Sequence, residues 1–186
     1  ALNRSLAANP DFPHGYYSRA GIHAKAGRHE LALQDYTKAI ELRPDHASLY
    51  ASRGDLYAEL GQYQKALKDY DRAVDLSPRW GAALFGRAKV HVLRGDPERA
   101  LKDFDRAIRL IPDCAETFVA RGGAYGEMGR FEEALADYAQ ALRLDPNSPA
   151  AYAGRGHTLV LAGRLEEALA DLARALELDP KYGEAY

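Results

Sequence analysis

The chain has 186 residues, of which 47% are hydrophobic and 28% are charged, a composition typical of an ordered, soluble protein with a sizeable core. Its 25 Lys and Arg residues nearly balance its 27 Asp and Glu residues, and the formal charge of -2 disfavours a nucleic acid as partner. No apolar stretch reaches the ~20 residues that cross a bilayer as a helix, so we expect no membrane insertion. The single cysteine, Cys114, excludes an internal disulfide and favours a reducing, cytoplasmic compartment.

Proline divides the chain at a fixed interval, 34 residues apart, at Pro10, Pro44, Pro78, Pro112, Pro146 and Pro180. Each proline follows an apolar helical pattern, and it marks a helix end because it lacks an N–H and disfavours helix in the preceding residue. In chain order, residues 1–12 are predicted to end a truncated repeat. Five full repeats follow at 13–46, 47–80, 81–114, 115–148 and 149–182, and residues 183–186 are predicted to begin another truncated one.

Each repeat is predicted to contain two helices joined by a short turn. Glycine can adopt positive φ and end the first helix, and one stands midway in every repeat, at Gly27, Gly61, Gly95, Gly129 and Gly163. The second helices have an apolar face of period 3.6, as in Ala32, Tyr36, Ala39 and Ile40. In the third repeat we expect a sharper start, because Asp96 can cap the second helix and Pro97 suits its first position. The fold class is therefore all-α.

The pattern resembles the tetratricopeptide repeat, whose motif has an aromatic residue, a glycine, a tyrosine, an alanine, a second aromatic residue and a proline at fixed positions. In the second repeat the matching residues are Tyr50, Gly54, Tyr57, Ala66, Tyr70, Ala73 and Pro78. In the fourth they are Phe118, Gly122, Tyr125, Ala134, Tyr138, Ala141 and Pro146. The resemblance covers essentially the whole chain. It implies a right-handed α-solenoid whose first helices form a concave, peptide-binding wall.

Two charged positions recur in every repeat. The arginines are Arg19, Arg53, Arg87, Arg121 and Arg155, and the aspartates are Asp35, Asp69, Asp103, Asp137 and Asp171. Both positions lie three or four residues from packing residues, so both face seams between helices. Buried charges are costly unless they are paired, so we predict Arg–Asp ion pairs that link helices within or between repeats. The alternative is that some arginines point into the groove and bind an acidic ligand.

No residue pattern indicates catalysis, a cofactor or a metal. His23 and His91 occupy an aromatic position of the motif, and the other histidines lack metal-ligand spacing such as H-E-x-x-H. Cys114 stands beside a helix-ending proline with no motif that would activate its thiol. The glycines Gly122, Gly123 and Gly126 lack the strand-then-helix context of a phosphate-binding loop. We therefore predict no enzyme activity in this chain.

The resemblance places candidate peptide-binding residues on the first helices. They are Tyr17, Ser52, Asp55, Glu59, Phe85, Lys89, Glu116, Val119, Glu127 and His157. Small residues on the same wall, among them Gly86 and Gly154, suggest close approach by a ligand or by a neighbouring helix. Some family members bind acidic chaperone tails through a lysine and an asparagine, but Tyr17 and Gly21 stand at those positions here. With Asp55, Glu59, Glu116 and Glu127 on the wall, we expect a mixed apolar and basic peptide.

The predicted function is a protein–protein interaction scaffold that binds a peptide or a partner protein in its concave groove. The alternative is a substrate-recruiting or regulatory segment of a larger enzyme whose catalytic domain lies outside this chain. RNA reading by helical repeats is disfavoured by the near-neutral charge. Solenoid ends expose apolar surface unless they are capped, so we also predict end-to-end self-association.

Overall fold

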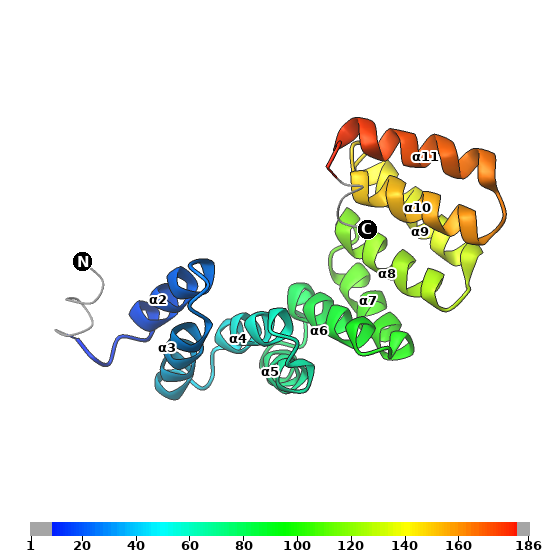
Figure 1. The fold of residues 1–186 in the computed structure, drawn as a ribbon. Helices are drawn as coiled ribbons and strands as arrows, with labels where there is room; N and C mark the ends of the chain where they lie inside the picture. Colours follow the sequence, from blue (N-terminus) through cyan, green and yellow to red (C-terminus); the bar gives the residue numbers. More distant parts are fainter. Residues whose placement is uncertain (1–8, 182–186) are drawn as a thin grey trace. The chain divides into compact units, whose positions relative to one another are not determined.

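The computed structural model describes residues 9–181, and throughout that range the regular structure is helical, as predicted (Figure 1). The helices are α2 (Pro13–Lys25), α3 (His29–Leu42), α4 (Ala47–Glu59), α5 (Tyr63–Leu76), α6 (Gly81–Leu93), α7 (Pro97–Leu110), α8 (Ala115–Glu127), α9 (Phe131–Leu144), α10 (Pro149–Leu161) and α11 (Leu165–Leu178). The even-numbered helices α2 to α10 begin at residues 13, 47, 81, 115 and 149, which keeps the interval of the prolines. The partial repeats predicted at the two ends lie largely outside the described residues.

The chain divides into two compact units, Ala1–Arg94 and Gly95–Tyr186, called unit 1 and unit 2 below. In unit 1 the described helices are α2 to α6: α2 packs on α3, α4 on α5, and α6 on both α4 and α5. In unit 2 they are α7 to α11: α8 packs on α7 and α9, and α10 packs on α9 and α11. The boundary falls at the turn between α6 and α7, inside the predicted third repeat.

The turn glycines end the first helix of each pair as predicted. All five have positive φ, between 69° at Gly27 and 76° at Gly163. At the first turn the Arg28 N–H donates to the His23 carbonyl at 2.9 Å, and the Gly27 N–H donates to Ala24 at 2.9 Å. This pair of bonds satisfies carbonyls that the helix end leaves without partners. A side chain at Gly27 would strain the turn.

Small residues let the paired helices approach closely. Ala32, Ala66, Ala100, Ala134 and Ala168 are almost completely buried at the same position of the five successive second helices. Aromatic and aliphatic side chains fill the space beside them, as in the unit 1 cluster of Ala20, Ala32, Tyr36 and Leu56. The first helices also carry exposed apolar side chains, among them Ile22 of α2 and Leu93 of α6.

The start of α7 confirms a local prediction. Pro97 is its first residue, and the Asp96 carboxylate accepts a hydrogen bond from the Arg99 N–H at 3.4 Å. The sequence reasoning missed a second cap at Ser148, whose hydroxyl accepts from the Ala151 N–H at 3.3 Å. Within residues 9–181, no helix is long and apolar enough to cross a membrane.

Candidate protein-binding surfaces

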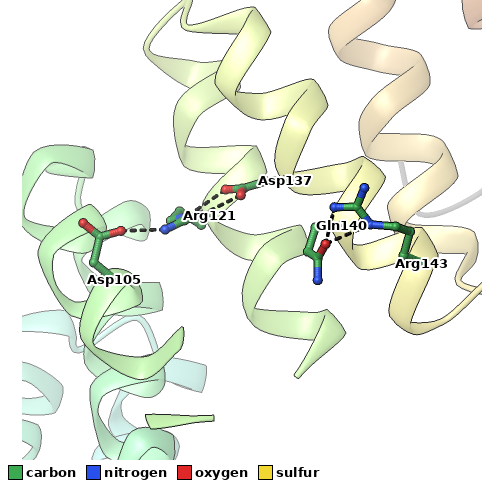
Figure 2. A network of polar contacts seen from close by, with 5 residues as sticks. All are labelled: Asp105, Arg121, Asp137, Gln140 and Arg143. Atoms are coloured by element: carbon green, nitrogen blue, oxygen red, sulfur yellow. Dashed lines mark hydrogen bonds and ion pairs between the residues drawn. The ribbon is translucent and has the colours of Figure 1, made fainter. Parts of the chain in front are cut away.

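Four of the recurrent arginines form two-bond ion pairs with the aspartate 16 residues further on. Arg121 donates from Nε and Nη2 to the two oxygens of Asp137, both at 2.7 Å (Figure 2). The matching pairs are Arg19–Asp35, Arg53–Asp69 and Arg155–Asp171, with distances of 2.6 to 2.8 Å. The predicted ion pairs are thus confirmed at four positions. The hypothesis that these arginines bind a ligand through the same atoms is wrong.

The remaining nitrogen of several arginines reaches the preceding helix pair. Arg121 Nη1 donates to Asp105 at 2.7 Å (Figure 2), and Arg53 Nη1 donates to the Thr37 hydroxyl at 2.9 Å. The hydrogen bonds to Asp137 are the main reason why the pKa of the Arg121 guanidinium is raised. Each such arginine therefore links helices both within one pair and between successive pairs.

Four of the predicted peptide-binding residues meet in one pocket of about 550 Å³ in unit 1. We call it the unit 1 groove; it is lined by Asp55, Ala58 and Glu59 of α4, Tyr70 of α5, and Ala82, Phe85, Gly86, Lys89, Val90 and Leu93 of α6. Asp55, Glu59, Phe85 and Lys89 come from two different repeats. Helices α4 and α6 bring them together because α5 packs against both.

Tyr70 forms the floor of the unit 1 groove. Its hydroxyl donates a hydrogen bond to the Asp55 carboxylate, and the residue is 2% exposed. Burial, reinforced by the charge of Asp55, raises the pKa of this hydroxyl. A Cβ atom on Gly86 would lie 2.5 Å from the ring, so only glycine fits there. The close approach inferred at Gly86 is therefore made by Tyr70 of the neighbouring helix.

Charge and aromatic surface are combined at the mouth of the groove. The Lys89 ammonium lies 5.3 Å from the centroid of the Phe85 ring, a favourable cation–π distance. Asp55 and Glu59 are exposed, and with Lys89 they leave a formal charge of -1 in the groove. An apolar surface beside two carboxylates suits a ligand with apolar and basic side chains.

Tyr17 and Ser52 meet elsewhere in unit 1. The Tyr17 hydroxyl lies 3.3 Å from the Ser52 hydroxyl, within hydrogen-bonding distance. The Tyr17 ring packs beside buried Tyr36, with centroids 5.9 Å apart, and is half-buried. Only part of this candidate peptide-binding side chain is thus open to a ligand.

The predicted residues of unit 2 are more dispersed. Glu116 and Glu127 lie at opposite ends of α8, roughly 16 Å apart along the helix axis. Val119 packs on the Phe118, Ala141 and Ala151 cluster. Glu127 and His157 are exposed, although partial burial of the Glu127 carboxyl raises its pKa. These residues do not form a counterpart of the unit 1 groove.

Sequence reasoning missed two features of these surfaces. Tyr70 was assigned only to packing, whereas its ring lies against Gly86 and its hydroxyl donates to Asp55. A second pocket, of about 440 Å³, lies beside Arg155 in unit 2. The residue that could have indicated it in the sequence is Ala139, which stands where earlier repeats have Thr37, Asp71 and Asp105.

Among the described residues, no group of three His, Cys, Asp or Glu side chains is arranged to hold a metal ion.

Several solved structures share this architecture. YrrB, described as a TPR protein with an unusual peptide-binding site, matches at 25% identity with a TM-score of 0.75, covering 100% of this chain and 95% of its own. A thermophilic TPR protein from Thermus thermophilus matches at 25% identity and a TM-score of 0.77, covering 93% and 94%. MamA 41-end from Desulfovibrio magneticus RS-1, at 20% identity and a TM-score of 0.81 over 91% and 96%, shares the fold.

Helix pairs stacked in this way define an α-solenoid, a class of protein–protein interaction scaffold. Models described as Tetratricopeptide repeat match residues 14–79, 52–113 and 149–182, and one described as TPR repeat matches residues 122–163. The chain belongs to the tetratricopeptide repeat family, whose members are generally scaffolds without catalytic activity. A comparison with curated proteins finds no match.

Proposed function

We propose that this scaffold binds a peptide segment of a partner protein in the unit 1 groove. The observation that carries the proposal is the meeting of Asp55, Glu59, Phe85 and Lys89 in one pocket. The likeness to YrrB, whose description includes a peptide-binding site, supports a peptide as the ligand. Pockets lined by apolar surface with a few polar groups are the usual form of ligand sites.

The ligand we propose carries apolar and basic side chains. An apolar side chain would pack on Phe85 and the apolar lining, and a lysine or arginine would pair with the exposed carboxylates of Asp55 and Glu59. Apolar anchors supply most of the affinity at such surfaces, while charged groups select the partner. The other predicted residues, Tyr17, Ser52, Glu116, Val119, Glu127 and His157, remain candidates for contacts to longer partners.

The test measures fluorescence anisotropy of a labelled decapeptide of alternating leucine and lysine. Phe85→Ala is expected to weaken binding about tenfold, because it removes the aromatic anchor. Glu59→Lys should weaken binding several-fold, and the loss should shrink at high salt because exposed charges are screened. Asp55 is left intact in both variants, since its carboxylate also accepts from Tyr70.

The matched control is Asp75→Lys, which makes the same charge change at an exposed residue of α5 outside the groove. A peptide with glutamate in place of lysine controls for the sign of the ligand charge. Equal losses for Glu59→Lys and Asp75→Lys, or unchanged affinity in Phe85→Ala, would rule out the unit 1 groove as the site.

We also propose that α11 mediates self-association with a second copy of the chain. Leu165, Leu169 and Leu176 of this helix are 58%, 68% and 47% exposed, a large apolar surface for one helix. Light scattering at increasing concentration should show a rise in mass that Leu169→Lys reduces. A concentration-independent monomer mass would contradict this proposal.

A further inference from the structure

In three successive first helices, the Nη1 atom of the recurrent arginine donates a hydrogen bond to the preceding second helix. Arg53 Nη1 donates to Thr37, Arg87 Nη1 to Asp71, and Arg121 Nη1 to Asp105. The distances are 2.9, 2.8 and 2.7 Å, and every acceptor stands 16 residues before its arginine on the preceding second helix. At this position of the repeat, Nη1 therefore binds a side-chain oxygen, which belongs to a hydroxyl once and to a carboxylate twice.

Arg155 occupies the same position in α10 but lacks that acceptor. The residue 16 positions earlier is Ala139, whose methyl group cannot accept a hydrogen bond. Arg155 Nε and Nη2 donate to the Asp171 carboxylate at 2.6 and 2.7 Å. The guanidinium carbon of Arg155 lies 5.7 Å from the centroid of the Tyr152 ring. Among the described residues, no hydrogen-bond acceptor is assigned to Arg155 Nη1. Its side chain is 28% exposed, against 18% for that of Arg121.

The replacement leaves a pocket of about 440 Å³ at this point, which we call the Arg155 pocket. Leu135 and Ala139 of α9 and Leu159 of α10 give it an apolar wall. The guanidinium of Arg155 supplies a polar group beside that wall. All of these residues belong to unit 2, and Arg155 faces a helix seam instead of the predicted concave wall.

The other charged groups that line the pocket are already paired. Glu167 accepts from Arg164 Nε and Nη2, both at 2.7 Å, and these bonds lower the pKa of the Glu167 carboxyl. Asp171 is bonded to Arg155 itself. Arg121 shows that one guanidinium of this series can bond two carboxylates at once, Asp137 and Asp105. Asp171 therefore does not prevent Arg155 from binding a second carboxylate.

We propose that the Arg155 pocket binds a carboxylate side chain, flanked by an apolar residue, from a partner protein. The carboxylate would accept from Arg155 Nη1 in the way that Asp105 accepts from Arg121, and the apolar neighbour would pack on Leu135 and Leu159. Charge-assisted bonds to an arginine edge are among the stronger hydrogen bonds in proteins. This site differs from the unit 1 groove in location and in ligand charge, so the failure of one proposal leaves the other standing.

The test is a chemical-shift titration of the isotopically labelled protein with a capped tripeptide of sequence Leu-Glu-Leu, following the Arg155 side chain and the α9 amides. The wild type should show saturable shifts there. Ala139→Asp should weaken binding about tenfold, because the new carboxylate occupies Arg155 Nη1. The same bond should raise the melting temperature by about 2–4 °C. Arg155→Lys, which keeps a cation beside Asp171 but loses the planar fork, should weaken binding similarly.

The matched control is Ala136→Asp, which adds the same charge on an exposed residue of α9 that does not line the pocket. Its affinity for the peptide should stay within about twofold of the wild type. A converse variant, Asp105→Ala, frees Nη1 of Arg121 and should create a second site of the same kind.

Three results would overturn the proposal. They are unchanged binding in both Ala139→Asp and Arg155→Lys, equal binding of a Leu-Gln-Leu peptide, or identical shifts with acetate alone at the same concentration. The last outcome would mean that the pocket takes any small anion and does not recognise a peptide.

Discussion

Units 1 and 2 each contain a tyrosine packed over a glycine, but they surround this contact with different side chains. Tyr70 over Gly86 in unit 1 corresponds to Tyr138 over Gly154 in unit 2, where a Cβ atom on the glycine would again lie 2.5 Å from the ring. Beside Tyr70 stands Asp55, whereas the corresponding residue beside Tyr138 is Gly123.

The rest of the groove changes in the same way. Phe85 and Lys89 of unit 1 correspond to Ala153 and His157 of unit 2. The packing residues are retained because both units must bury the same helix faces, while the residues that could select a ligand are replaced. The comparison shows that a repeat protein can acquire different binding surfaces without altering its frame.

The largest effect is expected where an ion pair is broken. After Asp69→Ala in unit 1, the hydrogen-bond acceptor that remains for Arg53 is the Thr37 hydroxyl. After Asp137→Ala in unit 2, Arg121 keeps a carboxylate acceptor, Asp105. We expect losses of about 3 and about 2 kcal/mol in the free energy of unfolding, since a partly buried arginine loses its main partner. Urea unfolding measures both losses.

The control is Glu41→Ala, which removes an exposed ion pair with Lys38 and should cost under about 0.5 kcal/mol. Equal losses for the two aspartates would show that the second acceptor is irrelevant.

The tyrosine–glycine contact can be broken in each unit separately. Gly86→Ala and Gly154→Ala place a methyl group against a ring and should each cost about 1–3 kcal/mol by thermal unfolding. Gly21→Ala is the control, because a Cβ atom there meets nothing within 4 Å. It should stabilise the helix by up to about 1 kcal/mol. If Gly86→Ala alone were tolerated, the two contacts would not be equivalent.

The smallest effect concerns the pH dependence of unit 1. Burial raises the pKa of the Tyr70 hydroxyl above its ordinary value of about 10. The folded state therefore keeps this proton where the unfolded chain releases it. The stability linked to this proton is complete below about pH 10 and is lost as the pH rises further.

Measured by urea unfolding from pH 8 to pH 11, the wild type should lose about 1 kcal/mol more than Tyr70→Phe. The comparison of the two proteins cancels the titration of lysines and other tyrosines. A stability difference that stays constant across this range would show that Tyr70 does not titrate differently in the folded state.

Features that depend on a recurring residue could be predicted from the sequence. The helix pairs, the positive-φ glycines and the Arg–Asp pairs follow from residue type and position alone, because the same local geometry is repeated. The resemblance to the tetratricopeptide repeat also placed Asp55, Glu59, Phe85 and Lys89 on one wall. Their meeting in a single pocket could not be foreseen, since it depends on the path of the Tyr70 side chain between α4 and α6.

The Arg155 pocket escaped prediction for a different reason. Arg155 matches the other recurrent arginines, and its bonds to Asp171 are of the predicted kind. What distinguishes it is Ala139, an ordinary helix residue that carries information only when it is compared with Asp105 and Thr37 at the same position. Because the pocket arises from the absence of an acceptor side chain at residue 139, no sequence motif marks it.

Ala139 also affects the order in which the helix pairs unfold. In stacked repeats, stability is close to a sum of terms for each repeat and for each junction between neighbours. Polar bonds between successive pairs join α3 to α4 through Arg53 and α7 to α8 through Arg121, but within residues 9–181 Arg155 makes no such bond from α10 to α9. The junction before α10 therefore depends more heavily on apolar packing for its cohesion. Amide hydrogen exchange should accordingly register opening of α10 and α11 at lower free energy than opening of α8 and α9.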